Sequence, residues 1–243
     1  GAIGYIGYDV IACYENLGEI PRDELNIPDI DLFICESFVI VDHQKEAMTL
    51  VVENTYSQRA EGELDSQLAI LERELQTPTK EEQTTLLPET LAFTSHFTQE
   101  AFAEVVNKAK EYITHGDLFQ VVPSQRLSGV FKQNPFDYYR KLRLSNPSAY
   151  LYYLDFNEGT KVIGSSPESL LQVKGQKVMT NPIAGTRKRG ATKAEDNQLA
   201  EELLVDEKER AEHLMLIDLG RNDIGRIAEV GSVTVPLCMV SEW

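Results

Sequence analysis

Short apolar segments of strand length constrain the fold of this 243-residue chain more than any other feature. Residues 32–41 and 47–54 are rich in β-branched side chains, and the polar residues 42–46 between them predict a hairpin. Other segments of the same kind, separated by turn residues, predict further strands at 118–127, 149–156, 161–165, 170–174, 177–181 and 231–236. The mixture of strand runs with a few helices predicts an α+β domain rather than regular βαβ alternation.

Three segments have helical periodicity. Residues 60–75 place leucines at helical spacing on one face (Leu64, Leu68, Leu71 and Leu75). A second helix is predicted between Thr98, a suitable N-cap, and Gly116, a suitable C-terminal stop. The last long helix is expected from about Lys193 to Leu216.

A stretch without periodicity divides the chain. Residues 76–95 are rich in Thr, Pro and Glu, and we predict a linker at 81–95. It would separate a remnant of an N-terminal region, residues 1–80, from a second domain at 96–243. Both ends look abrupt, so we expect a central piece of a longer protein.

The charge balance excludes some classes of partner. Lys and Arg total 23 and Asp and Glu total 39, which gives a net charge of −16. Such an acidic chain does not suit binding to nucleic acid or to an anionic membrane through its overall field. No apolar run approaches the ~20 residues of a membrane helix, and the N-terminus lacks the basic region of a signal peptide. We therefore expect a cytoplasmic protein.

The strongest candidate for chemistry is an acidic helix segment at 206–213. Glu209 and Glu212 are three residues apart and share one helix face. Carboxylates that project together suit a hard cation such as Mg²⁺, which takes one or two carboxylates plus substrate oxygens. The alternative is a solvated acidic face with Lys208 and Arg210 as partners.

A basic turn is the second candidate. Residues 181–190 read NPIAGTRKRG, where Gly185 permits close approach of a ligand and Thr186 offers a hydroxyl. The cluster 187–189 could attract a dicarboxylate, or it could be an exposed basic loop. Glu168 in GSSPES is either a positioned carboxylate or part of a turn. The segment 219–225, LGRNDIG, could place Arg221 and Asn222 near an anion or form a simple helix C-cap turn.

Five motifs occur in one order and together carry a resemblance: GDLFQVVPSQRL (116–127), NPSAYLYYLDF (146–156), GSSPESL (164–170), NPIAGTRKRG (181–190) and ERAEHLMLIDLGRNDIG (209–225). The chain resembles the anthranilate synthase component I (large-subunit) family of chorismate-utilising enzymes. The likeness covers residues 97–235, and the N-terminal residues resemble the end of that family's N-terminal region.

The resemblance implies a fold and a reaction. The fold is α+β, with antiparallel sheets packed face to face and outer helices, truncated here. The reaction is the Mg²⁺-dependent conversion of chorismate and ammonia into anthranilate and pyruvate in tryptophan biosynthesis. A glutamine amidotransferase subunit, component II, would deliver the ammonia, and tryptophan would be the feedback inhibitor.

The resemblance also implies roles for particular residues. These are metal binding by Glu212, acid–base catalysis by Glu168 or Glu209, chorismate binding by Gly185 and Thr186, and tryptophan binding by Ala149, Tyr150 and Leu151. The family's remaining active-site groups have no counterpart here, so we expect this chain alone to be inactive.

Two alternatives stay open. Aminodeoxychorismate synthase component I resembles this chain, but its family carries a nucleophilic lysine where Ala184 stands, and alanine cannot act as a nucleophile. The other is a non-catalytic remnant that binds an amidotransferase partner or tryptophan.

Overall fold

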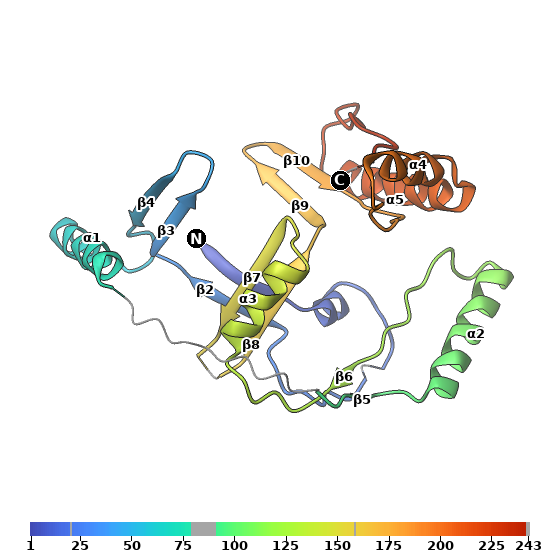
Figure 1. Ribbon diagram of the computed structural model, residues 1–243, viewed down its shortest axis with the longest axis horizontal. Coiled ribbons are helices and arrows are strands. Elements are labelled where there is room, and N and C mark those ends of the chain that lie inside the picture. The colour runs from blue at the N-terminus through green and yellow to red at the C-terminus, as the bar shows by residue number, and fades with distance from the viewer. Residues whose placement is uncertain (20, 79–90, 158, 242–243) are drawn as a thin grey trace. The chain divides into compact units, whose positions relative to one another are not determined.

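The computed structural model describes residues 1–19, 21–78, 91–157 and 159–241 (Figure 1). The chain divides into two compact units. The first contains Gly1–Gln133 and Leu154–Thr160, and the second contains Asn134–Tyr153 and Lys161–Trp243. The linker predicted at 81–95 lies largely outside the described residues, and the boundary drawn there stays a prediction.

Two strand pairs form the sheets at the beginning of the first unit. β1 (Ala2–Ile6) pairs antiparallel with β2 (Ile30–Ile34), and β3 (Ser37–Asp42) pairs antiparallel with β4 (Ala47–Val52). The second pair confirms the predicted hairpin. The strand expected at 32–41 is instead two strands, because the chain changes partner at residues 35–36: the Cys35 N–H donates to the carbonyl of Gly1 over 2.7 Å, whereas β3 pairs with β4.

Local sequence determines where the helices of this unit begin and end. α1 (Glu61–Gln76) and α2 (Gln99–His115) confirm the two predictions, and a 3₁₀ helix spans Tyr8–Cys13. The Thr98 hydroxyl accepts a hydrogen bond from the Ala101 N–H over 3.2 Å, which caps α2. Gly116 ends α2 at a φ of 82°, a conformation that favours glycine.

The segment 118–127 differs from its prediction. Only its last residue is in a strand, in the short pair β5 (Thr94–Ser95) and β6 (Leu127–Ser128). A strand needs a neighbour to accept its backbone hydrogen bonds, and the described residues provide none here. Phe119 is accordingly 94% exposed and Val122 is 80% exposed.

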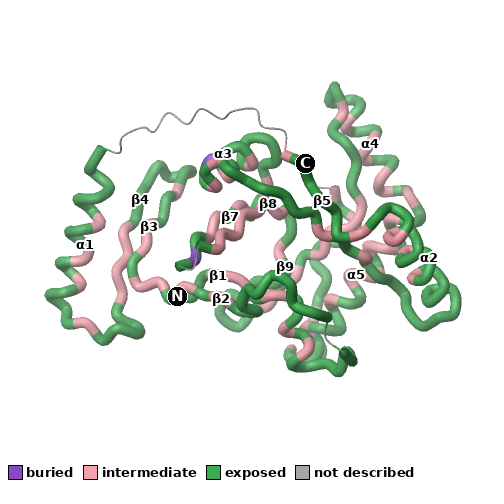
Figure 2. Tube along the Cα trace, turned by 90° about the horizontal axis from the view of Figure 1, so that it is seen from below, coloured by how far each residue is buried: buried purple, intermediate pink, exposed green. Residues whose placement is uncertain are grey.

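Phe156 is the one apolar residue that is buried among the described residues, with 4% exposure. Figure 2 shows that nearly all of the described trace is intermediate or exposed. Its ring stacks on Phe33 at a centroid distance of 4.6 Å and meets Tyr5 edge-on at 5.4 Å. Offset and edge-on aromatic contacts of this kind stabilise a small core beyond the area that they bury.

The second unit contains two further strand pairs and a helix that packs on one of them. β7 (Tyr150–Asp155) pairs with β8 (Lys161–Ser166), and β9 (Ser169–Lys174) pairs antiparallel with β10 (Lys177–Asn181). These strands confirm the predictions for 149–181. α3 (Pro135–Ser145), which the sequence analysis missed, contacts β8 and places Phe136 edge-on to Tyr153 at 5.2 Å.

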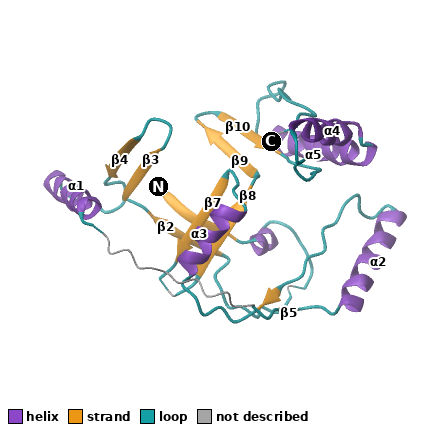
Figure 3. Cartoon of the chain, viewed as in Figure 1, coloured by secondary structure: helices purple, strands orange, loops and turns teal. Residues whose placement is uncertain are grey.

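The predicted long helix is two helices, α4 (Lys193–Val205) and α5 (Glu207–Gly225), shown together in Figure 3. The chain breaks at Asp206, whose extended backbone ends α4 and whose carboxylate caps α5. α5 continues through 219–225, so the turn considered there is wrong and Arg221 pairs along the helix with Asp218. The strand expected at 231–236 is also wrong, because these residues form no ladder.

The α+β class with antiparallel strands is confirmed. Of the helices that the structure describes, none combines the length and the hydropathy that a bilayer span needs.

Candidate functional site

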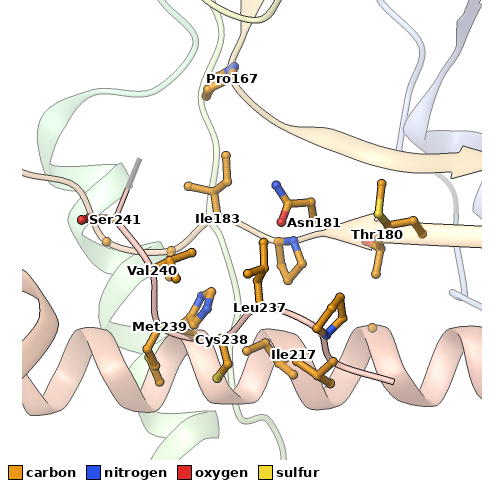
Figure 4. A pocket seen from close by; sticks show the side chains of 18 of the residues that line it. Pro167, Thr180, Asn181, Ile183, Ile217, Leu237, Cys238, Met239, Val240 and Ser241 are labelled. Atoms are coloured by element: carbon orange, nitrogen blue, oxygen red, sulfur yellow. The ribbon is translucent and has the colours of Figure 1, made fainter. Parts of the chain in front are cut away.

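A cavity of about 1500 Å³ lies in the second unit. Three stretches line most of it: the loop that follows β10, the facing sides of α4 and α5, and residues 232–241. Figure 4 shows Ile183 from the loop and Ile217 from α5 on either side of Leu237. The lining combines these apolar side chains with the polar residues of the loop.

Two arginines of the basic loop form ion pairs with carboxylates of the helical part, α4 and α5. Arg187 Nη2 donates to Asp206 Oδ2 over 3.0 Å, and Arg187 Nη1 donates to Glu209 Oε1 over 3.2 Å. Arg189 makes a separate contact with Asp196 on α4, with Nη2 2.6 Å from Oδ2. Hydrogen bonds from Arg189 and from the Gly190 N–H lower the pKa of Asp196. The same contact raises the pKa of Arg189.

Asp206 fixes the beginning of α5. Its Oδ1 accepts hydrogen bonds from the backbone N–H of Lys208 over 3.0 Å and of Glu209 over 3.1 Å. The bond from Glu209 is the main reason why the pKa of Asp206 is lowered, and the nearby Arg187 guanidinium acts in the same direction. A negative side chain at this end also complements the helix dipole.

The carboxylate of Glu209 lies against the backbone of Gly185. A Cβ added to Gly185 would overlap Glu209 Oε2 and would come within 2.9 Å of Leu203 Cδ1. A larger residue at 185 would require the ends of the Glu209 and Leu203 side chains to move, so the small residue and the carboxylate are matched in space. The Glu209 side chain is 19% exposed.

The other residues predicted for this loop and for GSSPES lie nearby. Thr186 lines the cavity, and its carbonyl accepts from Arg187 Nη1 over 3.0 Å. Glu168 is exposed and lies outside the lining, but its Oε1 accepts from the Ile183 N–H over 3.4 Å, which brings this carboxylate to the loop.

Glu212 and most of the segment predicted for tryptophan binding lie outside the lining of the cavity. Glu212 is half-buried on α5, one turn beyond Glu209. Within the described part of the chain, no three His, Cys, Asp or Glu side chains gather as a metal-binding group. Ala149 lines the cavity, whereas Tyr150 and Leu151 begin β7.

Two parts of the site escaped the sequence analysis. The first is the pairing of Arg187 with Glu209, 22 residues away, for which the sequence contains no local signal. The second is the apolar side of the cavity. The sequence does contain a signal for that side, because Glu209, His213, Ile217, Gly220 and Ile224 line the cavity from α5 at helical spacing.

The arrangement can orient a small polar ligand. A carboxylate held by a guanidinium lies against the Gly185 backbone, Thr186 lines the same cavity, and apolar side chains form the opposite wall. Ligand sites are commonly concave and largely apolar, with a few placed polar groups of this kind.

Comparison with known proteins gives consistent results. The family described as chorismate binding enzyme matches residues 1–242. "Anthranilate synthase component 1" of Lactococcus lactis is 50% identical over all of this chain and 53% of its own length. "Aminodeoxychorismate synthase component 1" of Bacillus subtilis is 41% identical, over 100% of this chain and 51% of its own length.

A solved structure of a relative has the same fold as this chain. Anthranilate synthase component I from Streptococcus pneumoniae superposes with a TM-score of 0.88 at 47% identity, covering 97% of this chain and 52% of that one. The chain spans about half the length of the curated relatives that it matches. Because the family match extends over nearly every residue, the chain belongs to the family of chorismate-binding enzymes.

Proposed function

We propose that the protein to which this chain contributes is a lyase that converts chorismate and ammonia into anthranilate and pyruvate, a step of tryptophan biosynthesis. One observation carries the proposal: the Glu209 carboxylate lies against Gly185 in a cavity that Thr186 also lines. The relatives named anthranilate synthase component 1 support the choice of reaction.

Different residues of the site would have different roles in the reaction. Gly185 and Thr186 would bind chorismate through the loop backbone and the Thr186 hydroxyl, beside the Glu209 carboxylate. Departure of the ring hydroxyl as water requires a proton, and Glu209 or Glu168 would supply it.

The donor set suits Mg²⁺ only in part. Mg²⁺ usually takes one or two carboxylates, and waters and substrate oxygens complete its shell. Glu212, to which the resemblance assigns metal binding, would provide such a carboxylate, although it lies outside the lining of the cavity. When bound, Mg²⁺ would act as a Lewis acid on the ring carboxylate of chorismate.

The proposed partners follow from the reaction. A glutamine amidotransferase subunit would deliver ammonia, and tryptophan would inhibit at the segment Ala149–Leu151. We place the protein in the cytoplasm, where soluble substrates of this kind are made and used. The net charge of −16 argues against nucleic acid and anionic membranes as partners.

Aminodeoxychorismate synthesis is a second candidate, because a relative of that name is 41% identical. Ala184 lines the cavity with a methyl group, which cannot replace a nucleophilic lysine. We therefore prefer ammonia as the attacking group. A non-catalytic remnant would bind an amidotransferase or tryptophan but show no chorismate binding in the cavity.

Calorimetry with chorismate and Mg²⁺ tests the proposal. We expect weak binding to the chain, with a Kd on the order of 1 mM. Glu209→Gln should abolish the heat of binding, and Glu207→Gln, an exposed position in the same helical turn, should retain it. Equal binding by both variants would place chorismate elsewhere, and no binding to the unmodified chain would remove the cavity as a chorismate site.

A further inference from the structure

Arg187 joins two carboxylates that belong to different parts of the site. Its two terminal nitrogens reach Asp206 and Glu209, at 3.0 and 3.2 Å. The three side chains are partly shielded from water, with exposures of 31% for Arg187, 35% for Asp206 and 19% for Glu209. A planar guanidinium can make two such contacts in fixed directions, which an ammonium group cannot.

Asp206 is itself anchored to the helix that carries Glu209. One of its oxygens caps α5 by accepting from the N–H of Lys208 and of Glu209, and the other accepts from Arg187. Rotation of the Asp206 side chain would therefore break the cap. The cap and the ion pair hold each other in place, and Arg187 is fixed relative to the first turn of α5.

Both oxygens of Glu209 are then accounted for. Oε1 accepts from Arg187, and Oε2 lies at the position where Gly185 has no side chain. Without the guanidinium, the flexible Glu209 side chain could rotate toward solvent, because the residue sits in the first turn of the helix. We infer that Arg187 is a positioning residue that aims the Glu209 carboxylate at the Gly185–Thr186 backbone. A catalytic consequence of this positioning rests on the proposed function, whereas the contacts between Arg187, Asp206 and Glu209 do not depend on it.

Arg189 provides a matched control within the same loop. It also pairs with a carboxylate of the helical part, but that carboxylate is Asp196 on α4. Loss of either arginine removes one positive charge from the loop, together with the ion pairs to Asp206 and Glu209 for Arg187 and the ion pair to Asp196 for Arg189. The two variants differ in which carboxylate is released.

The test measures the reactivity of single carboxylates. Carbodiimide-activated coupling of an amine, followed by mass spectrometry, gives labelling rates for Glu209, Asp206 and Asp196 in the full chain. We expect Arg187→Gln to raise the rates at Glu209 and Asp206 about three- to fivefold, as for loss of a partly exposed ion pair, and to leave Asp196 unchanged. Arg189→Gln should raise the labelling rate at Asp196 and leave the rates at Glu209 and Asp206 unchanged. Arg187→Lys should protect both carboxylates less well than arginine does, because its single nitrogen lacks the rigid fork that presents two terminal nitrogens in fixed directions.

Unchanged labelling of Glu209 in Arg187→Gln would overturn the inference. An equal rise at Asp196 in that variant would also overturn it, because it would show a general loss of structure. The readout uses no chorismate, so a chain that fails to bind chorismate leaves the positioning role standing. Conversely, a negative labelling result would not contradict the proposed function, which is tested separately by calorimetry with chorismate.

Discussion

Glu209 and Gly185 are complementary in shape: the carboxylate of one fills the space that the missing side chain of the other leaves. The contact joins the first turn of α5 to the loop that follows β10. Glycine is required here for a close approach and not for an unusual φ, because its φ is not in the left-handed region.

Gly185→Ala should therefore displace the Glu209 carboxylate. We expect the free energy of unfolding to fall by about 1 kcal/mol, the low end of the usual cost of overpacking, because the ends of the Glu209 and Leu203 side chains can move away from the new methyl group. We also expect chorismate binding in calorimetry to be lost. Gly225→Ala is the control, because a Cβ at this helical residue meets nothing within 4 Å. That variant should be neutral or up to about 1 kcal/mol more stable. Equal effects of both substitutions would contradict the steric argument.

A second prediction concerns turnover. The 243-residue chain, supplied with chorismate, Mg²⁺ and an ammonium salt, should form no anthranilate detectable by fluorescence. The reason is the state of the two proposed acid–base groups: Glu209 is engaged by Arg187, and Glu168 lies outside the lining of the cavity. Anthranilate fluorescence that rises with chain concentration and disappears in Glu209→Gln would show that the chain is sufficient for catalysis.

A third prediction concerns the pH dependence of the contact between Arg189 and Asp196. The pKa of Asp196 is lowered in the folded chain, first by the hydrogen bond from Arg189. A carboxylate with a lowered folded pKa contributes stability above its unfolded pKa of about 3.9 and loses it as the pH falls through the folded value. The difference in unfolding free energy between the unmodified chain and Asp196→Asn should thus be constant from about pH 5 to 7 and shrink below about pH 4.

The measurement is chemical denaturation at several pH values, followed by circular dichroism. Glu201→Gln, an exposed position on the same helix, is the control and should show a much smaller difference at every pH. A difference between Asp196→Asn and the unmodified chain that stays constant down to pH 3 would mean that Asp196 does not titrate with a lowered pKa.

The sequence predicts those parts of the fold that short-range interactions determine. The hairpin β3–β4 follows from two β-branched runs around a polar turn, and α2 follows from Thr98 and Gly116 at its ends. The break at Asp206 was missed although it has a signal, because an aspartate three residues before Glu209 resembles a capping box. α3 likewise begins with Asn134 as N-cap and a proline in its first turn.

The parts of the fold and of the site that the sequence does not predict depend on interactions between residues far apart in the chain. Residues 118–127 have the composition of a strand, but a strand also needs a neighbouring backbone, and the composition of one segment does not reveal that neighbour. In the site, the motif residues Gly185 and Glu209 could be singled out in the sequence. Their contact, and the arginine that maintains it, depend on how α5 packs beside the loop. The roles assigned to the site residues all stay predictions: Glu168, Gly185, Thr186, Glu209, Glu212, Ala149, Tyr150 and Leu151.

The last prediction concerns the small core of the first unit. Phe156 is 4% exposed and stacks on Phe33, so Phe156→Ala should remove both its burial and its aromatic contacts. We expect a loss of about 3–5 kcal/mol in the free energy of unfolding, as for other buried phenylalanines. Phe119→Ala is the matched control: at 94% exposure the same truncation should change stability by less than about 0.5 kcal/mol.

Hydrogen exchange at the amides of β1 and β2 is the appropriate local measurement, because Tyr5 and Phe33 pack on Phe156 from these strands. Exchange there should become faster in Phe156→Ala and stay unchanged in Phe119→Ala. If both variants exchanged alike, the stability of the β1–β2 pair would have to come from its backbone ladder alone. An isolated pair of strands is at best marginally stable in water, which is why we expect the aromatic contacts to decide the outcome.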